Sequence, residues 1–563
     1  MEPGYAPVPT FTVEKDHMKY LRLGLFVLCA LLSASRACSQ SGQNYGSLLT
    51  PRVRANKTPA PANLKAYVQD GAIRLSLRDS IQLALENNSD IQIEETSIES
   101  RKFSLLGTWS PFDPAVQGNL NINRYSSPGF SQLQGVGASG NGTLNSLAQS
   151  GQINYLQTFL SGTNINVGLS SNKSSTNSSF YFFNPYFSTT LNLQFTQPLL
   201  RNFGKFANTA PIKIAQRGLA QSRATFEAEV NDAVLQVVNQ YWAAVEARGA
   251  LDVQQRALKL AQASFDRDKR ALELGALPPL DISRSESEVA ARKVQLIQSQ
   301  YALAQSEETL RYTIGADQDP QLNSLHLELT ESPEPAEMEG IDAETVLKDA
   351  LSARPEIEAA NDAVLADQDS IRLAHNQLRP DLELNGFYQS SGLGGNQHSL
   401  ITGQLTSTGG IGTSFNQLFG FGFPGYGGQL TLNMPIRNRA AQSRLGNDLV
   451  ARTRDLYTSR QVEEQIVRQV RDALNQLDTA RLSLTAAESS LDLAKKSLAA
   501  DQRKFELGAE ANFFVLDSQT RLANAELVLL QTRISYQLAL AAIQHASGKL
   551  LAPYLVQIET MSK

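Results

Sequence analysis

Two stretches of the chain decide its fold because each is a copy of the other. The first is RALELGALPPLDISRSESEVAARKVQLIQSQYALAQSEETLRYTIG, residues 270–315, and the second is QRKFELGAEANFFVLDSQTRLANAELVLLQTRISYQLALAAIQHASG, residues 502–548. Gly275 matches Gly508 and the closing glycines also match, so the copies are offset by 233 residues. Self-similarity at a fixed offset indicates a duplicated structural unit. We therefore expect two similar halves.

The repeat extends upstream of these stretches. FTQPLLRNFG around Pro198 corresponds to TLNMPIRNRA around Pro435, and ALENNSDI from Ala84 corresponds to ALSARPEI from Ala350. Each copy is expected to run as helix, strands, long helix and helix. The predicted divisions are a first repeat over 75–327, an acidic, proline-bearing linker over 328–340, a second repeat over 341–550 and a tail over 551–563.

The long helices carry a coiled-coil pattern. In the second copy, small and branched apolar residues follow at alternating spacings of four and three, which predicts a heptad seam. They are Ile466, Val470, Ala473, Leu477, Ala480, Leu484, Ala487, Leu491, Ala494 and Leu498. In the first copy the apolar residues recur every seven at Val230, Val237, Ala244, Leu251, Leu258 and Phe265. Polar residues interrupt that first seam at Arg248, Gln255 and Gln262.

Segment lengths indicate an elongated molecule. Pro211–Gly275 covers 65 residues and Pro435–Gly508 covers 74, so each helix would be about 100 Å long. The remaining predicted helices, of about half that length, are Ser76–Trp109, Leu280–Gly315, Ile341–Arg379 and Asn512–Gly548. The fold class expected is mainly α with β, with long helical coiled coils.

Between the helices, apolar residues alternate with small uncharged polar ones. The segments are Val116–Asn123, Ile165–Ser170, Leu191–Gln197, Leu382–Tyr388 and Gln429–Met434. Strands of this kind, joined by Gly/Ser/Asn-rich connections, are typical of transmembrane barrels, although a soluble strand can alternate in the same way. Long connections are expected at 126–150, 171–186 and 390–425.

Four or five strands cannot close around a water-filled lumen, because the smallest membrane barrels need about eight. An open sheet edge is not tolerated in lipid. Several chains must therefore contribute strands to one barrel, and a homo-oligomer is expected.

The N-terminal region reads as an export signal. Residues 18–39 contain basic Lys19 and Arg22, a short apolar run and then small residues, which is signal-peptide anatomy, and residues 1–17 read as an extension or a mis-assigned start. Cleavage after Ala37 would leave Cys38 at the mature N-terminus as a possible lipidation site. Ordinary cleavage with an inert Cys38 is the alternative.

Composition argues against enzymes and nucleic-acid binders. The net charge is −5 and no basic surface is indicated, so nucleic acid is not an expected partner. The five histidines are scattered without metal-ligand spacing, and both cysteines lie in the first forty residues. No catalytic residue, metal site or cofactor is predicted.

The duplicated helix, hairpin, long-helix and helix order, the LGA turn and the QPLLRNFG segment resemble the TolC outer-membrane factor family over roughly 75–550. This resemblance implies a homotrimer with a shared twelve-stranded transmembrane β-barrel and a helical tunnel in the periplasm. It implies as partners outer-membrane lipid, a periplasmic adaptor (membrane fusion) protein and an inner-membrane pump of resistance-nodulation-division or ATP-binding-cassette type.

The resemblance also places a gate at the helix-hairpin tips, where acidic residues follow the tip glycine. Asp281 and Asp517 are the acidic gate candidates. In the second copy, Phe514 stands six residues after Gly508, where an acid is expected, and Phe513 lies beside it, so both are also gate candidates. The alternative is that both aspartates cap the returning helices. The residues expected to meet the adaptor are Leu274, Gly275, Ala276, Leu507, Gly508 and Ala509.

The function expected is that of a channel subunit in the outer membrane of a Gram-negative-type bacterium, with a large periplasmic portion. It would passively conduct cargo delivered by the pump and the adaptor. The alternative is a non-conducting periplasmic coiled-coil scaffold or adaptor. The alternating strands favour the channel, because an adaptor would not carry duplicated barrel hairpins.

Overall fold

A computed structural model describes residues 67–69, 72–129, 134, 142–274, 279–316, 325–334, 341–399 and 401–554. The predicted signal peptide and Cys38 lie outside these residues. The chain divides into two compact units, and the boundaries fall inside helices α3, α4, α7 and α9. The strand unit comprises residues 106–213 and 369–448, and the helical unit comprises most of the rest.

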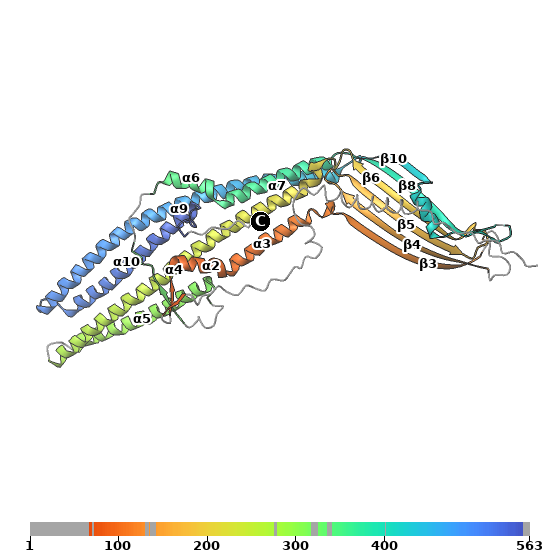
Figure 1. Cartoon of the computed structure of the whole chain (residues 1–563). Helices are drawn as coiled ribbons and strands as arrows, with labels where there is room; N and C mark the ends of the chain where they lie inside the picture. Colours follow the sequence, from red (N-terminus) through yellow and green to blue (C-terminus); the bar gives the residue numbers. More distant parts are fainter. Residues whose placement is uncertain are drawn as a thin grey trace, which may run out of the picture. The chain divides into compact units, whose positions relative to one another are not determined.

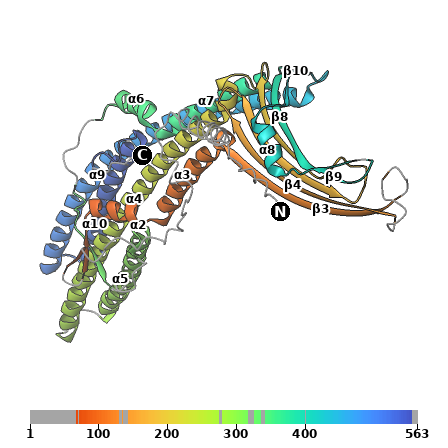
Figure 2. The ribbon, with the colours of Figure 1, turned by 45° about the vertical axis from the view of Figure 1, so that its right-hand side comes forward.

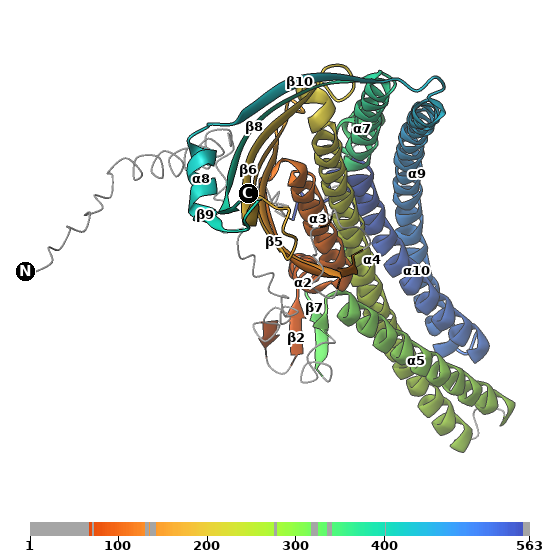
Figure 3. The same ribbon diagram turned by 90° about the vertical axis from the view of Figure 1, so that its right-hand side faces the viewer.

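The strand unit is built on one antiparallel sheet, which Figure 3 shows as a curved layer. Its order is β10-β8-β6-β5-β4-β3, with β9 beside β8. The strands are β3 (Ala115–Pro128), β4 (Thr143–Thr158), β5 (Asn164–Thr176), β6 (Phe183–Pro198), β8 (Asp381–His398), β9 (Leu405–Ser407) and β10 (Pro424–Asn433). Strand β8 of the second copy pairs with β6 of the first, so the copies share the sheet.

The register gives this sheet one apolar and one polar face. Cross-strand partners share a face, and Val167 lies opposite Leu193, which lies opposite Tyr388, which lies opposite Tyr426. The neighbouring positions on the other face carry Asn, Gln, Thr, Ser and Gly in most places. The predicted alternation of apolar and polar faces is therefore confirmed.

The strands are longer and more numerous than the sequence suggested. Within the residues that the structure describes, six strands belong to the main order, whereas a twelve-stranded trimeric barrel would need four from each chain. The predicted connection at 126–150 contains the end of β3 and the start of β4, and the one at 390–425 contains β9 and helix α8 (Ile411–Phe419). Ser-, Asn- and Gly-rich ends of strands lack an apolar alternation, but backbone hydrogen bonds in the ladder still hold them.

The helical unit contains the long helices that were predicted. Helix α4 (Lys205–Glu273) has 69 residues and α9 (Arg439–Glu506) has 68. Their returning partners α5 (Pro279–Thr313) and α10 (Asn512–Ala546) have 35 each and lie alongside them (Figure 1). The two other predicted helices are each divided in two, giving α2 (Leu77–Asn87), α3 (Ser89–Gly107), α6 (Ala343–Ala353) and α7 (Pro355–Gln377).

The seam of the second copy is confirmed. Its residues from Ile466 to Ala487 are buried, and they pack against α10 residues such as Tyr536 and Ile543. In the first copy, Val230, Val237 and Ala244 are buried as predicted, but Leu251, Leu258 and Phe265 are only half-buried. The buried positions near the end of α4 include Gln254, Ala261 and Asp268, each three residues further on than the predicted position.

A small second sheet ties the first copy together. Strand β2 (Ala72–Leu75) pairs with β1 (Val68–Gln69) and, in parallel, with β7 (His326–Leu329). Its side chains enter the main core beside Tyr241, whose hydroxyl donates to the Leu75 carbonyl at 3.2 Å. The stretch predicted as a linker from residue 328 thus begins inside β7.

Candidate functional site at the helix-hairpin tips

The first hairpin tip joins α4 to α5. Leu274 directly follows α4 and is 84% exposed. Gly275 and Ala276 lie outside the described residues. Asp281 is the third residue of α5, and its side chain is not among those described, so its gate and cap roles both stay predictions.

The second tip is described throughout. Gly508 has a φ of +70°, and the amide of Ala509 donates to the Lys504 carbonyl at 2.9 Å. A left-handed residue with this bond is a Schellman helix end, so Gly508 terminates the second long helix, as its predicted bounds required. Leu507 beside it is 77% exposed. An exposed leucine therefore stands at each tip.

Asp517 does not cap its helix. The N-cap of α10 is Ala511, and the first turn contains no acidic residue. Asp517 lies in the second turn, is 38% exposed, and forms an ion pair with Arg521 at 2.7 Å. The capping interpretation of Asp517 is wrong because α10 begins at Asn512, too far before the aspartate for it to reach the free amides. The gate interpretation is not tested by this geometry.

The two phenylalanines form a pair at the start of α10. The rings of Phe513 and Phe514 are 5.5 Å apart between centroids and meet edge to face. Both side chains are about half exposed. The second tip thus presents an aromatic pair one turn before its carboxylate.

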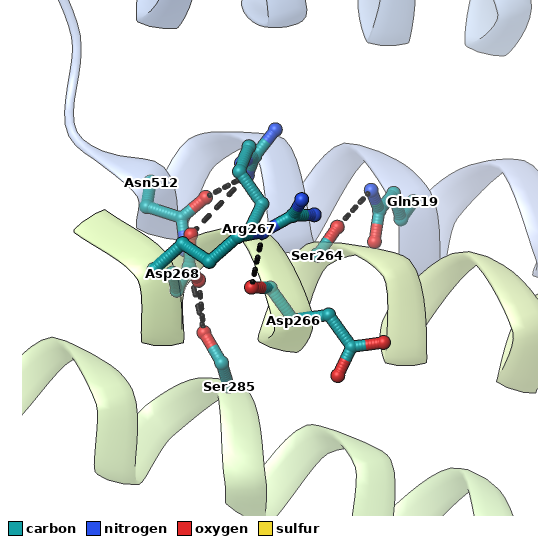
Figure 4. Close-up of polar contacts among 8 residues, drawn as sticks. Ser264, Asp266, Arg267, Asp268, Ser285, Asn512 and Gln519 are labelled. Atoms are coloured by element: carbon teal, nitrogen blue, oxygen red, sulfur yellow. Dashed lines mark hydrogen bonds and ion pairs between the residues drawn. The ribbon is translucent and has the colours of Figure 1, made fainter. Parts of the chain in front are cut away.

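Near the tips, the two hairpins are joined by a largely buried set of polar groups, which we call the inter-hairpin cluster (Figure 4). It consists of Arg267 and Asp268 from α4, Ser285 from α5 and Asn512 from α10. The Asn512 amide donates to the Asp268 carboxylate at 2.5 Å and to the Ser285 hydroxyl at 3.4 Å. The Ser285 hydroxyl donates to Asp268, and Arg267 donates to the Asn512 amide oxygen at 3.0 Å.

Three members of the cluster, Asp268, Ser285 and Asn512, are buried, while the Arg267 side chain is partly exposed. Asp268 is 1% exposed and Asn512 is 5% exposed. A buried carboxylate is tolerated only with charged or hydrogen-bonding partners, and Arg267 supplies a guanidinium 3.4 Å from Asp268. The same guanidinium lies 4.7 Å from the centroid of the Phe505 ring on α9. Arg267 therefore contacts both helices of the second hairpin.

Further hydrogen bonds continue this connection along the helices. Gln519 of α10 donates to Ser264 of α4 at 3.0 Å. Arg292 of α5, which is buried, donates to the Thr520 hydroxyl at 2.6 Å. The contact between the hairpins near their tips is thus polar, whereas the seam of α9 from Ile466 to Ala487 is apolar.

Each copy carries the same pair of aspartate and serine. Asp501 and Ser518 stand 233 residues after Asp268 and Ser285, and the Ser518 hydroxyl donates to Asp501 at 2.5 Å. That hydrogen bond, aided by the Lys504 ammonium, holds the pKa of Asp501 below its usual value. The pairs close each hairpin on itself, and only the first is enclosed by the inter-hairpin cluster.

Sequence reasoning missed the cluster. The signal was available in the repeat, because Ser264, Asp268 and Ser285 reappear at the 233-residue offset as Ser497, Asp501 and Ser518. The seven-residue spacing of Gln254, Ala261 and Asp268 marks the buried line on α4. The partner Asn512 has no counterpart in the first copy, where the matching residue is Pro279, and so no pattern pointed to it.

Other kinds of site find little support. Within the described ranges, no group of three His, Cys, Asp or Glu side chains is placed to hold a metal ion. Among the helices in those ranges, none has the length and apolarity that a membrane span requires.

Comparison with known proteins places the chain in a family. The model of the family described as "Outer membrane efflux protein" matches residues 164–316 and 346–549, which is more than half of the chain. The chain belongs to the outer membrane efflux protein family. The two matched segments fall in the two copies found from the repeat, and the resemblance drawn from the sequence is confirmed.

Relatives within this family are distant. The toluene efflux pump outer membrane protein TtgC of Pseudomonas putida is 21% identical over 305 residues, which cover 54% of this chain and 57% of TtgC. The outer membrane protein TolC of Vibrio cholerae is 21% identical over 60% of this chain and 72% of that protein. The chain thus spans only a little over half the length of TtgC.

Solved structures agree on the fold. The CmeC outer membrane channel of Campylobacter jejuni matches with a TM-score of 0.59 and 14% identity, over 90% of this chain and 92% of that one. A membrane protein of Pseudomonas aeruginosa matches with a TM-score of 0.59 and 16% identity, over 86% and 92%. At such identities the likeness shows the fold alone, which is that of the outer-membrane efflux channels.

Proposed function

We propose that this protein is the channel subunit of an efflux system in the outer membrane, through which cargo passes after delivery from the inner membrane. Membership of the outer membrane efflux protein family supports this role, as do relatives named as outer membrane proteins of efflux pumps. The protein acts as a conduit and not as an enzyme. The inner-membrane pump would select the cargo, because a conduit does not need a substrate-binding pocket of its own.

The observation that carries the proposal is the main sheet. Among the strands that the structure describes, β3 and β10 each pair on one side only. A sheet with an apolar face and two open edges cannot sit in lipid alone, because unpaired backbone groups are costly there. Copies of the chain therefore join edge to edge and close a barrel whose polar face lines the lumen.

A homotrimer is the assembly that the family resemblance implies. Three copies with six strands each would close a barrel of 18 strands, in place of the twelve first expected. Barrel diameter grows roughly linearly with strand number, and barrels of 16–18 strands leave an aqueous channel. The proposed 18-stranded barrel would therefore be about 1.5 times as wide in diameter as a twelve-stranded barrel.

The hairpin tips form the proposed gate at the periplasmic end. Asp281, Asp517, Phe513 and Phe514 would line it, and a ring of carboxylates would attract cations. The ion pair of Asp517 with Arg521 offsets part of that charge, while the aromatic pair narrows the opening. The inter-hairpin cluster holds the tips together through hydrogen bonds, which are individually weak enough to be exchanged when the gate opens.

The exposed leucines at the tips are proposed to contact the periplasmic adaptor. Exposed large apolar side chains at a protruding end are typical of protein contacts. The pump would be of the resistance-nodulation-division or the ATP-binding-cassette type. Changing Leu274 and Leu507 to aspartate should reduce co-purification of the adaptor without changing the oligomer, whereas retained adaptor binding would exclude the tips as its docking site.

Single-channel conductance in a planar bilayer tests the function. The purified oligomer should give discrete, small openings, and Asp517→Ala or Phe514→Ala should enlarge them or make them more frequent. Asp492→Ala, on an exposed part of α9, is the matched control and should leave conductance unchanged. A protein that never inserts or conducts would favour the alternative of a non-conducting scaffold.

A further inference from the structure

The short helix α8 packs against the main sheet of the strand unit. Figures 2 and 3 show α8 lying against β8, and in Figure 3 it is on the outer side of the curved sheet. The Ser390 hydroxyl donates to the Leu418 carbonyl at 2.7 Å, and both residues are fully buried. Gln417 accepts a hydrogen bond from the Leu393 amide at 2.9 Å. The helix is therefore bonded to the strand and not merely adjacent to it.

Small residues on β8 make room for this helix. A Cβ atom added to Gly392 would lie 1.9 Å from the Ser414 carbonyl oxygen, and one added to Gly394 would lie 2.4 Å from the Gly410 carbonyl oxygen. No side chain larger than hydrogen fits at either position without moving α8. At Ser390, Gly392 and Gly394 this face of β8 therefore carries small residues, and α8 packs against them.

The helix lies on the apolar face of the sheet. Ser390, Gly392 and Gly394 alternate in register with Tyr388 and so share its face. The loop after α8 stays on that face, because the Phe421 ring packs 6.3 Å from the Tyr388 ring between centroids. In the proposed channel this is the face toward lipid.

The segment around α8 is uncharged and aromatic. Residues 399–436 contain no Asp, Glu, Lys or Arg. Phe415 and Phe419 stack on one side of α8, while Phe421, Phe423 and Tyr426 are exposed directly after it. Exposed aromatic residues without neighbouring charges are unusual on a surface in water, but they are enriched where a membrane protein meets the lipid interface.

The position of α8 along β8 agrees with such an interface. A strand rises about 3.4 Å per residue and a barrel strand tilts by about 40°, so each residue adds about 2.6 Å along the membrane normal. Starting from Asp381, Ser390 lies at about 23 Å and Gly394 at about 34 Å. The apolar band of such barrels is about 25 Å tall, so α8 lies at its outer edge.

We infer that α8 and its aromatic neighbours form a lipid-contacting collar at the outer-leaflet interface of the membrane. Subunit pairing does not cover this surface, because copies join at β3 and β10 whereas α8 lies over β8 and β6. The occupant is lipid at the boundary of acyl chains and headgroups, where an amphipathic helix lies in the plane of the interface. This inference rests on the proposed channel function.

Depth-dependent quenching of tryptophan fluorescence tests the collar. The full chain would be reconstituted in phosphatidylcholine vesicles brominated either near the headgroup end or deep in the acyl chains. Phe415→Trp is compared with Phe195→Trp, at mid-depth on the same face, and with its neighbour Gln194→Trp on the polar face. Each signal is read as the difference from the parent, which contains Trp109 and Trp242.

We expect shallow bromines to quench Phe415→Trp at least twofold more than deep ones. Phe195→Trp should show the reverse order, and Gln194→Trp should be quenched by neither. If Phe195→Trp is quenched and Phe415→Trp is not, protein or lumen surrounds α8, and the collar is refuted while the channel stands. If neither is quenched, the proposed channel fails as well.

A second variant separates the collar from its sheet. Gly392→Val places side-chain atoms where the Ser414 carbonyl lies, so α8 should detach and the shallow preference of Phe415→Trp should fall by half or more. Phe195→Trp in the same background reports whether the sheet is still inserted. An unchanged depth profile at Phe415 with an inserted sheet would overturn the docking described here.

Discussion

The two copies contain one hydrogen-bonded pair in two different surroundings. Asp268 and Ser285 close the first hairpin, and Asp501 and Ser518 close the second. The first pair is buried beneath Asn512 and Arg267, whereas the Asp501 side chain is 17% exposed and has Lys504 beside it. Duplication therefore kept the bond within each hairpin but not the environment around it.

The difference teaches where the two hairpins are held together within one chain. At the position of Asn512, the first copy has Pro279, whose side chain has no hydrogen-bond donor. Only the second hairpin can therefore reach across with an amide. Loss of Asp268 should affect the contact between hairpins, while loss of Asp501 should affect one hairpin only.

The largest effect is expected from Asp268→Ala compared with Asp501→Ala. Removing Asp268 takes away the carboxylate that accepts hydrogen bonds from the buried Asn512 amide and Ser285 hydroxyl, which should lower the free energy of unfolding by about 2–3 kcal/mol. Asp501→Ala should cause a clearly smaller loss, because water can replace the carboxylate there. The midpoint of thermal unfolding in detergent measures both, and equal shifts would show that the enclosure of Asp268 has no energetic consequence.

A smaller effect is expected from Asn512→Ala, which makes the first pair resemble the second. Loss of its hydrogen bonds should lower the free energy of unfolding by about 1–2 kcal/mol. A double-mutant cycle with Asp268→Ala should give a coupling of at least about 0.5 kcal/mol, since the two side chains touch. Additive changes would mean that the two residues act independently. Single-channel recording of Asn512→Ala should also show more frequent opening if the cluster holds the gate closed.

Arg267→Lys tests the planar guanidinium of the cluster. Lysine keeps the charge but cannot both donate to Asn512 and lie flat against Phe505. We therefore expect the free energy of unfolding to fall by about 0.5–1 kcal/mol. Phe505→Leu, made in the parent and in the Arg267→Lys variant, separates the ring contact from the hydrogen bond. If Phe505→Leu is equally harmful in both backgrounds, the ring contributes only by packing.

The smallest effect is a pH dependence at the second pair. A carboxyl group whose folded pKa is lowered contributes stability above its unfolded pKa, and that stability is lost as pH falls through the folded pKa. Asp501 should therefore stabilise the second hairpin above about pH 4 and cease to do so in more acid solution. Ser518→Ala should weaken the pH dependence of the unfolding midpoint between about pH 6 and pH 3, and an unaltered curve would contradict the role of the hydroxyl.

The helical half of the fold was predictable because its signals are local and repeated. The alternating spacing from Ile466 to Leu498 predicted the seam of α9, and the tip glycines predicted the ends of the long helices. The buried face of α4 near the tip was harder to find, because it includes the polar residues Gln254, Ser264 and Asp268. Polar residues in a seam look like solvent-exposed ones until their partners on another helix are known.

The strand half was predictable in kind but not in extent. Alternation located five of the six strands of the main order, and the pleat fixed which residues share a face. Strand β4 was missed because the run Thr143–Thr158 carries Asn and Gln on both faces, which blurs the alternation. Helix α8 was missed because nine residues between glycines give a weak periodic signal, and its docking depends on Gly392 and Gly394 in a separate strand.

The parallel pairing of β2 with β7 has a consequence for how the chain is made. The paired residues lie 254 positions apart, at the beginning and the end of the first copy. A chain that emerges from its N-terminal end must deliver α2 to α5 and the intervening strands before β2 meets this neighbour. Until then β2 has an open edge capable of wrong pairings. Arrival of residue 326 is thus the step that closes the small sheet, and the first copy cannot complete this sheet until nearly its whole length is present.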